Sequence, residues 1–411
     1  MTATVPGVAS PTDSVTARST ASAGANSAAA LLTDLQRLGP LARKQLCRTT
    51  GLSFTTVTRM CASLIEIGVL AELEPRPSER TGPGRAGRPE IPLDFAAGGR
   101  LLVGVHIRPW STTCTVFDLT AAELSHAEYV HPAGASPGEL LAAGVAMTAD
   151  VLSTVDISRT LGIGVSIGGL VDHDRRVSVE SPMLGWREVD LGAAFDPLGL
   201  AVHVDSSVRC LALDQLWRRG SQVGDTSLTL FVSEIVGAAI IVDRRLRRGP
   251  GASAGNILHF PVHDGPGTVC SCGRRNCLSA VVSNPALYDQ ALAVGAAPPD
   301  TQWHTPVYKY QDNPVMAALR RRRAGWLGEA AGTLIELLNP DTTVIAGHLG
   351  TQDDIDHMFA VARSRCSTTL GARPTSVLHR EAGADVWDRA SVSLVLDDYL
   401  RHPARYEPAL A

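Results

Sequence analysis

The hydrophobic periodicity of the chain changes near residue 100, and this change divides it into two regions. Between Asn26 and Ile67, apolar residues recur at a spacing near that of an amphipathic helix. From Leu101 onward, short apolar runs typical of strands alternate with longer helical segments. The pattern therefore predicts a small helical module followed by a larger α/β body.

The helical module has the pattern of a helix-turn-helix. It predicts one helix from Asn26 to the stop at Gly39-Pro40, a short helix over residues 43–49, and a third from Ser53 to about Ile67. The segment Gly51-Leu52-Ser53 forms the turn, and Ser53 is suited to cap the third helix. Two helices joined by a short turn that contains glycine are typical of DNA-binding proteins, although a plain three-helix bundle has the same pattern.

In a helix-turn-helix, the early residues of the second helix of the pair enter the major groove. The residues that we expect at DNA are Arg43, Ser53, Phe54, Thr55, Thr56, Thr58 and Arg59. Arg59 could take a guanine through two hydrogen bonds, and the threonines could contact phosphate or a thymine methyl group.

The segment that follows resembles the wing of a winged helix. Residues 69–73 and 91–93 are predicted strands, and the Gly/Pro-rich tip between them carries Arg80, Arg85 and Arg88. Arginines on a slim tip suit the narrow minor groove of A·T-rich DNA, whereas a solvated linker is the alternative. Residues 27–90 carry nine basic and six acidic residues in a chain of net charge −4, which favours a local contact with DNA.

Composition limits the remaining classes of protein. A chain of 411 residues with 45% hydrophobic and 19% charged residues should hold two or three domains with sizeable cores. No run of about 18 apolar residues is present, so we expect no membrane span. Residues 1–26 are rich in small and polar residues and lack the pattern of a signal peptide, which predicts a disordered tail and a cytoplasmic protein.

A metal site is predicted by the stretch H-F-P-V-H-D-G-P-G-T-V-C-S-C-G-R-R-N-C. It holds His259 and three of the eight cysteines of the chain, Cys270, Cys272 and Cys277. Zinc prefers four such ligands in a tetrahedron, and four protein ligands leave no open position, which indicates a structural zinc ion. The spacing alone does not decide between His259 and His263 as the fourth ligand.

Several passages of the larger region, in this order, resemble the ROK family. This family groups sugar-responsive repressors with sugar kinases on an actin/hexokinase-like fold. The matching passages are G-V-S-I-G-G-L-V-D (164–172), L-G-W-R-E-V-D-L (184–191), V-H-V-D (202–205), G-A-S-A-G-N-I-L-H (251–259) and C-S-C-G-R-R-N-C-L (270–278). The family pattern favours His259 over His263, and G-R-A-G-R-P resembles the repressor branch.

The resemblance covers the chain from about residue 27 and implies an α/β fold with three parts. These are a tail over residues 1–26, a winged helix-turn-helix domain over residues 27–98 and a two-lobed ROK domain over residues 99–411. The first lobe is expected at about residues 99–213 together with a C-terminal helix over residues 384–402. The second lobe, at about residues 214–383, is expected to hold the zinc loop.

The chain departs from the kinases of the family at two motifs. Where these kinases have D-x-G-x-T on the first strand, this chain has V-H-I-R-P-W-S-T, with His106 at the Asp position. Pro109 cannot donate an N–H to a phosphate, and Trp110 occupies space that a nucleotide would need. The catalytic Asn-Asp pair aligns with Ser206 and Ser207, and a hydroxyl cannot serve as the general base. We therefore expect no phosphoryl transfer.

The expected ligand pocket is also altered. Two glutamates that bind sugar hydroxyls in the family are replaced by Asn256 and Ser279. The resemblance implies a pocket that comprises Gly169, Asp205, Ser206, Ser207, Asn256 and His259. Because two carboxylates are missing, a sugar phosphate is as well suited to this pocket as a sugar. The alternative is an empty cleft in a body that only dimerises.

These expectations combine into one hypothesis. The protein is a transcriptional regulator, in the simplest case a repressor, that binds double-stranded operator DNA as a homodimer or homotetramer. Its ROK domain carries zinc and senses a sugar or a sugar derivative. The alternatives are a sugar kinase with a DNA-binding head and a dimeric repressor that acts without a ligand.

Overall fold

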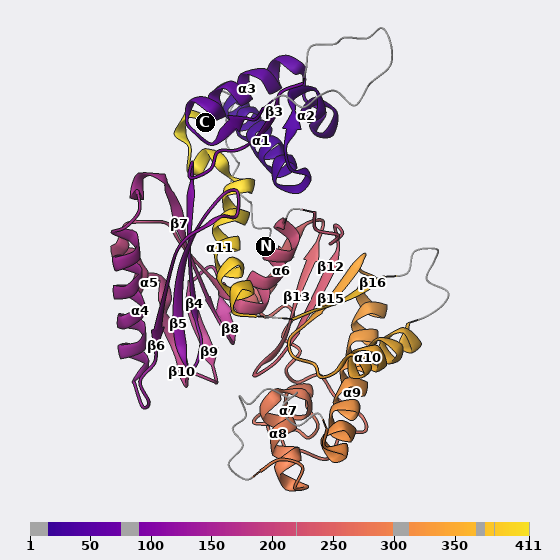
Figure 1. Ribbon diagram of the computed structural model, residues 1–411. Coiled ribbons are helices and arrows are strands. Elements are labelled where there is room, and N and C mark those ends of the chain that lie inside the picture. The colour runs from indigo at the N-terminus through magenta and orange to yellow at the C-terminus, as the bar shows by residue number, and fades with distance from the viewer. Residues whose placement is uncertain are drawn as a thin grey trace, which may run out of the picture. The chain divides into compact units, whose positions relative to one another are not determined.

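The computed structural model describes residues 15–74, 90–218, 220–298, 312–366, 375–381 and 383–410. The chain forms two compact units (Figure 1). Unit 1 comprises Met1–Arg100 and Leu396–Ala411, and unit 2 comprises Leu101–Val395. Among the described residues, no helix combines the length and the apolar character needed to cross a membrane.

Unit 1 consists of three helices and a small antiparallel sheet. Its elements are α1 (Val15–Leu38), β1 (Leu41–Ala42), α2 (Arg43–Thr50), α3 (Phe54–Glu66), β2 (Leu70–Glu72) and β3 (Pro92–Phe95). Strand β3 lies between β1 and β2 and is antiparallel to both. The helices bury Leu31, Leu35 and Leu64 completely, so the apolar repeat in the sequence forms the core of this unit.

Helix α1 begins earlier than the sequence predicts. The expectation of a disordered tail over residues 1–26 is wrong for Val15–Asn26, which belong to α1. The sequence before Asn26 has no apolar repeat that could indicate a helix, although alanine favours one. Residues 1–14 lie outside the described residues, as does the segment 75–89 with Arg80, Arg85 and Arg88.

The last residues of the chain belong to unit 1, which differs from the expected boundary of the ROK domain. Arg100 donates two hydrogen bonds to the carboxylate of Glu407, at 2.6 and 2.8 Å. The hydroxyl of Tyr406 donates to Asp398 at 2.7 Å. The Arg100–Glu407 pair therefore connects the C-terminal segment to the earlier part of unit 1, whereas the Tyr406 bond lies within the segment.

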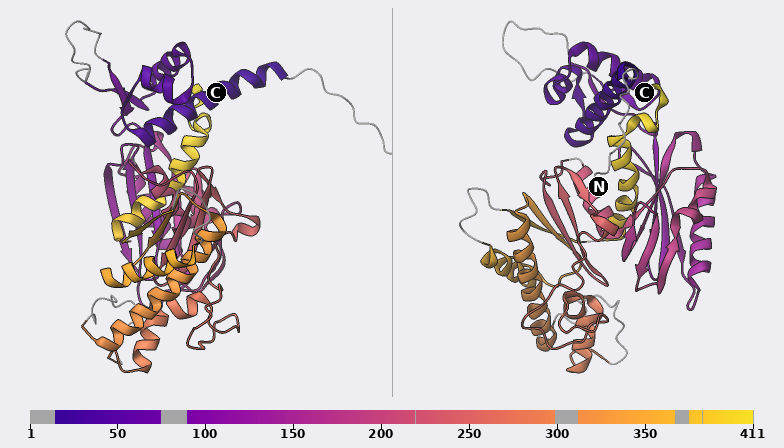
Figure 2. Two further views of the ribbon diagram at one scale, coloured as in Figure 1. Left: turned by 90° about the vertical axis from the view of Figure 1, so that its right-hand side faces the viewer. Right: turned by 180° about the vertical axis from the view of Figure 1, so that it is seen from behind.

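The first lobe of unit 2 is built on a five-stranded sheet of order β11-β7-β4-β5-β6. Its strands are β4 (Leu101–Ile107), β5 (Ser111–Asp118), β6 (Glu123–Val130), β7 (Thr160–Ile167) and β11 (Val202–Ser206). Helix α4 (Pro137–Leu152) covers one face and α11 (Ala384–Arg401) the other (Figure 2). Because both faces are covered, every residue of β4, β5 and β7 is buried, and these strands lack a polar alternation.

Helix α11 packs very closely on this sheet. A Cβ atom at Gly104 of β4 would lie 2.9 Å from the Cγ1 atom of Val392, so only glycine permits this approach. Thr113 donates to Asp388 at 2.7 Å, and the hydroxyls of Ser166 and Ser391 are 2.7 Å apart. The last helix of the chain therefore completes the core of the first lobe.

A small sheet of order β10-β9-β8 extends the first lobe. Its elements, with the following helices, are β8 (Leu170–Asp172), β9 (Val177–Ser181), β10 (Trp186–Asp190), α5 (Leu191–Phe195) and α6 (Ser207–Trp217). The side chains of Trp186 and Phe195 are buried against the core of the large sheet. This places β9 and the start of α6 near the carboxyl ends of β7 and β11, which run parallel.

The second lobe of unit 2 contains the other five-stranded sheet, of order β14-β13-β12-β15-β16. Its strands are β12 (Ser227–Val232), β13 (Val236–Val242), β14 (Arg245–Arg247), β15 (Thr342–Ala346) and β16 (Ser376–Arg380). Its helices are α7 (Leu278–Val282), α8 (Asn284–Ala293), α9 (Pro314–Leu338) and α10 (Gln352–Arg365). Two sheets with helices confirm the predicted α/β class.

A run of four arginines on α9, residues 320–323, would be expected at a solvated or interface face, but only Arg321 and Arg322 are exposed. Arg320 and Arg323 are 2% and 1% exposed. Arg320 pairs with Asp354 of α10 at 3.0 Å, and Arg323 donates to the carbonyl of Val282 and to Asn284. These bonds compensate the burial of two cations.

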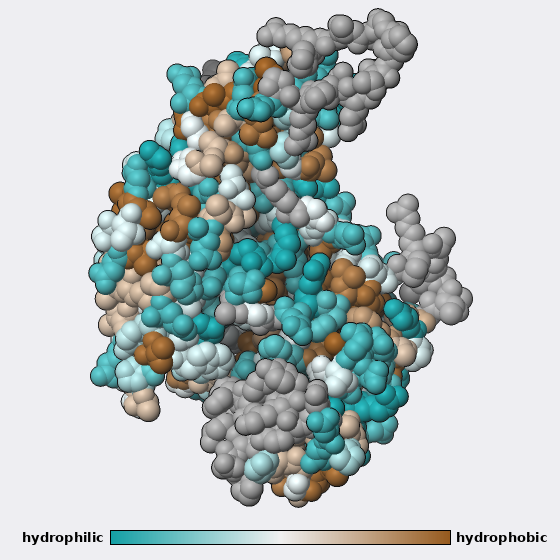
Figure 3. Space-filling view, viewed as in Figure 1, coloured by the Kyte–Doolittle hydropathy of each residue, from teal (hydrophilic) through white to brown (hydrophobic). Residues whose placement is uncertain are grey.

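On the face drawn in Figure 3, hydrophobic residues form small separate groups among hydrophilic ones.

Candidate functional sites

The first candidate site is the loop between β14 and α7, which holds the Cys/His motif. Two isolated antiparallel bridges shape this loop, one between Val269 and Arg275 and one between Pro261 and Cys277. The N–H of Cys270 donates to the carbonyl of Arg274 at 2.8 Å, which closes a tight hairpin. The hairpin brings the three cysteines of the motif to one point.

The ligand atoms of His259, Cys270, Cys272 and Cys277 lie within 4.8 Å of one another. The Sγ atoms of Cys272 and Cys277 are 3.6 Å apart, and the Sγ atom of Cys270 is 3.5 Å from Nδ1 of His259. A tetrahedral zinc ion would hold two sulfurs about 3.8 Å apart and a sulfur and a nitrogen about 3.6 Å apart. The four atoms therefore fit one zinc ion, whereas His263 is exposed and outside the group.

The charge state of this loop also suits a metal. A hydrogen bond from Arg274 lowers the pKa of the Cys272 thiol to about 6. The thiolate is the form of cysteine that binds metal ions. Burial, together with hydrogen bonds to Cys272 and Cys270, raises the pKa of the Cys277 thiol, so Cys272 loses its proton more readily than Cys277.

The second candidate site is the start of α3 in unit 1. Gly51, in the left-handed conformation at a φ of 73°, ends α2, and the Ser53 side chain accepts the N–H of Thr56 at 3.1 Å. The hydroxyls of Ser53 and Thr56 also bond to each other at 2.9 Å. Both residues therefore shape the helix start, which the prediction of Ser53 as a cap anticipated.

The other predicted DNA contacts on α3 are exposed. Phe54, Thr55, Thr58 and Arg59 all lie on the open side of the helix, and Phe54 is 56% exposed. Arg43 differs from them, because its guanidinium pairs with Glu72 of β2 at 2.8 Å. Arg43 therefore connects α2 to β2, and it is less available to DNA than Arg59.

The six residues expected to form one ligand pocket lie in four places. Gly169, Ser206 and Asn256 line a cavity of about 80 Å³. Ser207 lines a second cavity of about 170 Å³. Asp205 and His259 line neither, since Asp205 is fully buried and His259 belongs to the zinc loop.

Asp205 is the centre of a buried ion cluster. Arg209 donates to one carboxylate oxygen and Arg248 to the other, each at 2.8 Å. Burial alone would raise the pKa of Asp205, but the two guanidinium groups outweigh it and hold the pKa below its ordinary value. Arg209 also donates to the carbonyls of Val171 and Ala252. The carboxylate is thus fully engaged within the protein.

Sequence reasoning missed both arginines of this cluster. Arg209 stands four residues after Asp205, a spacing that brings side chains together at a helix start and could have suggested the pair. Arg248 follows β14 in the second lobe, and no local pattern in the sequence relates it to Asp205.

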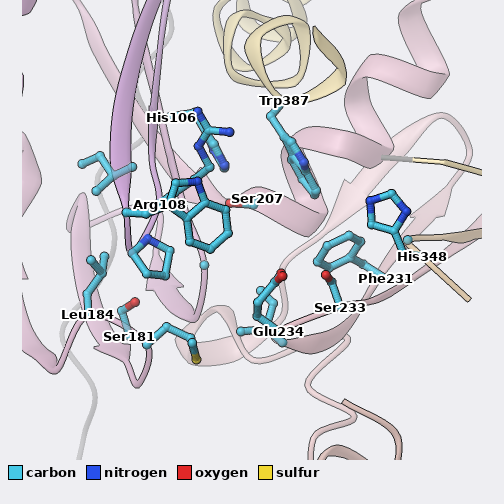
Figure 4. A pocket seen from close by; sticks show the side chains of 17 residues that line it. His106, Arg108, Ser181, Leu184, Ser207, Phe231, Ser233, Glu234, His348 and Trp387 are labelled. Atoms are coloured by element: carbon cyan, nitrogen blue, oxygen red, sulfur yellow. The ribbon is translucent and has the colours of Figure 1, made fainter. Parts of the chain in front are cut away.

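The cavity of about 170 Å³ takes its walls from both lobes (Figure 4). The rings of His106 and Trp387 stack at 5.2 Å, and Phe231 contacts the Trp387 ring edge-on at 4.9 Å. Burial lowers the pKa of His106 to about 3, so its imidazole is neutral at physiological pH. Pro109 and Trp110, in the turn between β4 and β5, complete one wall.

The structure is thus a helix-turn-helix unit combined with a two-lobed α/β body that carries a Cys3His loop. The model of the ROK family matches residues 102–385, and the chain belongs to this family.

Proteins similar to this chain include regulators of transcription. A transcriptional regulator of Mycobacterium tuberculosis is 31% identical over 340 residues, which cover 80% of this chain and 75% of that protein. The DNA-binding transcriptional dual regulator NagC of Escherichia coli is 25% identical over 334 residues, 78% of this chain and 80% of that protein.

Solved structures show the same fold. A ROK family transcriptional regulator, described as a homologue of the E. coli MLC protein, has a TM-score of 0.76 at 19% identity and covers 95% of this chain and 99% of that one. A ROK hexokinase from Thermus thermophilus has a TM-score of 0.60 at 21% identity and covers 72% of this chain and 98% of that one. The fold alone is therefore shared by regulators and kinases.

Proposed function

We propose that this protein is a DNA-binding transcriptional repressor whose ROK body senses a small molecule. The observation that carries the proposal is the exposed start of α3, where Phe54, Thr55, Thr58 and Arg59 are presented by a capped helix-turn-helix. The similarity to named transcriptional regulators over most of the chain supports it. A cytoplasmic location goes with this function.

The effector in this proposal is a sugar derivative. A relative in Shigella flexneri, 25% identical over 334 residues, is named an N-acetylglucosamine repressor. The cavity that contains Gly169, Ser206 and Asn256 is the proposed place, since Asn256 can both donate and accept hydrogen bonds. Operator half-sites follow the symmetry of the protein, so the DNA-binding form is a homodimer or a homotetramer.

A structural zinc ion belongs to the same proposal. His259, Cys270, Cys272 and Cys277 would hold it, and the ion would stabilise a loop that has no apolar core of its own. The distances between the ligand atoms support this assignment.

Catalysis of phosphoryl transfer is not part of the proposed function. The first residue of α6 is Ser207, which cannot act as a base at neutral pH, and the neighbouring Asp205 is engaged by two arginines. The similarity to kinase structures concerns the fold. Neither Ser207 nor Asp205 supports the alternative of a sugar kinase. Turnover of ATP with a hexose would revive it.

The DNA-binding proposal is tested by fluorescence anisotropy with duplexes selected from a random library by the purified protein. Arg59→Ala should weaken binding by about 1–3 kcal/mol and relax the preference at one base pair. Arg245→Ala, which removes an exposed arginine from β14 in unit 2, is the matched control and should leave binding unchanged. Equal affinities for the Arg59→Ala and wild-type proteins would show that α3 does not read DNA.

A further inference from the structure

The cavity between the two lobes has no role in the function proposed above. Its volume is about 170 Å³, and the side chains of Trp387, Phe231, Ser207 and Glu234 surround one space (Figure 4). Its lining differs from that of the adjacent cavity that contains Asn256, with Ile235 in the wall of both. Its ligand can therefore differ from the proposed sugar derivative.

The size and the walls of this cavity suit an aromatic ring. An apolar cavity of about 150 Å³ is enough to hold benzene. Trp387 is fixed on the side of His106 by stacking and on the side of Phe231 by an edge-on contact. Rings that are held in one orientation favour a flat partner, because offset stacking and edge-on contacts need defined planes.

Two polar groups of residues in the wall lack a partner among the described residues. The hydroxyl of Ser207, a residue only 3% exposed, forms no hydrogen bond with any described residue, and the same holds for the Nε atom of Arg108. Both residues line the cavity. Buried polar groups are normally bonded, so an unpaired hydroxyl indicates a place for a ligand oxygen.

The position of Ser207 strengthens this indication. Ser207 is the first residue of α6, a helix of 11 residues, and the capping side chain of Ser206 accepts no N–H of that helix. The first N–H groups of a helix have no partner within it. An oxygen atom at the Ser207 hydroxyl would therefore also face the donor end of α6.

The charges around the cavity favour a neutral ligand. The Arg108 guanidinium pairs with Glu128 at 3.1 Å, and Glu234 adds a carboxylate to the wall. His106 is buried against Trp387 and carries no charge at neutral pH. Pro109 has no N–H to offer a phosphate. A phosphate or a carboxylate would thus meet the carboxylate of Glu234 and an arginine that already has an acidic partner.

We propose that this cavity binds a neutral, planar aromatic molecule of one ring or two fused rings that bears a hydroxyl or carbonyl oxygen. Its ring packs among Trp110, Phe231 and Trp387, and its oxygen bonds with the hydroxyl of Ser207. The chain would then respond to an aromatic compound through a site distinct from its sugar pocket.

The test is isothermal titration calorimetry of the zinc-loaded full chain with 4-hydroxybenzamide. The expected result is one binding site per chain. The saturated analogue, trans-4-hydroxycyclohexanecarboxamide, carries the same polar groups without a planar ring and should bind at least tenfold more weakly, by about 1.4 kcal/mol. Equal binding of both compounds, or no heat from either, would overturn the proposal.

Three variants locate the site. Ser207→Ala should weaken binding by about threefold to tenfold, the worth of one net hydrogen bond. Ser178→Ala is the matched control, because its hydroxyl is equally buried and without a partner among the described residues but does not line the cavity. Met183→Trp fills the cavity from a half-buried rim position and should abolish binding.

The outcomes separate this site from the sugar pocket. If Ser178→Ala weakens binding as much as Ser207→Ala, or if Met183→Trp binds like the wild-type protein, the compound lies elsewhere. Competition by glucose 6-phosphate against 4-hydroxybenzamide would also overturn the proposal, because the cavity would then be part of a sugar phosphate site. Circular dichroism of each variant verifies its fold. The effect of Arg59→Ala on DNA binding is measured separately, so failure of this proposal would leave the proposed function standing.

Discussion

The zinc loop and the start of α6 both gather charged side chains, but they neutralise them differently. The loop brings Cys270, Cys272 and Cys277 together beside one histidine. In the function proposed above, this group depends on an added cation. At the start of α6, Asp205 has two arginines of the chain as partners. The first region is therefore complete only with an ion, whereas the second is complete by itself.

This difference teaches where each region is vulnerable. Removal of the ion would leave thiolates crowded around an empty centre, with Val262 and Phe260 at the base of the loop still packed on the core of the second lobe. Replacement of Asp205 leaves its arginine partners without a carboxylate. A chelator has no such effect, because the partners of Asp205 are arginines of the chain and not a metal ion. Four measurements test this difference between the two regions, and they follow in order of expected effect.

Chelation should affect the zinc loop most strongly. Structural zinc contributes about 10–16 kcal/mol to the folding of small zinc domains, so Cys272→Ser should lose the metal and unfold the loop. Zinc content by mass spectrometry and proteolysis within residues 259–277 measure the effect. Cys366→Ser removes a half-buried cysteine of α10's end and should keep one zinc per chain. Full zinc in the Cys272→Ser protein would refute the ligand set.

The Asp205 cluster should respond to mutation and not to chelators. Asp205→Ala leaves the buried Arg209 and the half-buried Arg248 without their carboxylate and should cost about 3–5 kcal/mol in urea denaturation. The matched control is Asp385→Ala, which removes a pair of the same spacing with Arg389 at the surface and should cost at most about 1 kcal/mol. Similar costs for the two variants would show that Asp205 is not a buried anchor.

The same carboxylate should give a defined pH dependence. Its pKa is held below the ordinary value of 3.8, so protons bind the unfolded chain more readily than the folded one. The stability that Asp205 contributes is present above pH 3.8 and is lost as the pH falls through the lower, folded value. The unfolding free energies of the wild-type and Asp205→Asn proteins should therefore converge on acidification, and a constant difference would contradict the prediction.

The smallest effect is expected at His263. This residue is exposed and outside the ligand group, so His263→Ala should change stability by no more than about 0.5 kcal/mol and keep the zinc. His259→Ala should lose it. Zinc loss in the first variant and retention in the second would reverse the assignment of the fourth ligand.

The two regions also show what the sequence could reveal. The ligands of the zinc loop lie within residues 259–277, so their spacing alone indicated a common centre. The partner of Asp205 in the second lobe, Arg248, is brought to it by the packing of two lobes, and no periodicity records that contact. The same limit applies to Ser206 and Ser207, which are neighbours in sequence. The sequence predicts one pocket for both, whereas each of them lines a different cavity.

Alternation of strands and helices was sufficient to predict the α/β class, because it depends on burial within each element. It did not predict that Arg320 and Arg323 are buried, since a run of arginines normally marks a surface, and their partners Asp354 and Asn284 lie on other helices. Tertiary partners, which the local pattern does not contain, decided each of these cases.

The packing of α11 on the first lobe has a consequence for folding during translation. The hydrogen-bond partner of Thr113, Asp388, lies 275 residues further along the chain and is synthesised later. At about 5–20 residues per second, translation separates the two by roughly 15 to 55 seconds. During that interval the sheet around Gly104 is without the helix that covers it. Chaperones that bind nascent chains would therefore have an extended opportunity at the first lobe, although it is synthesised before the second.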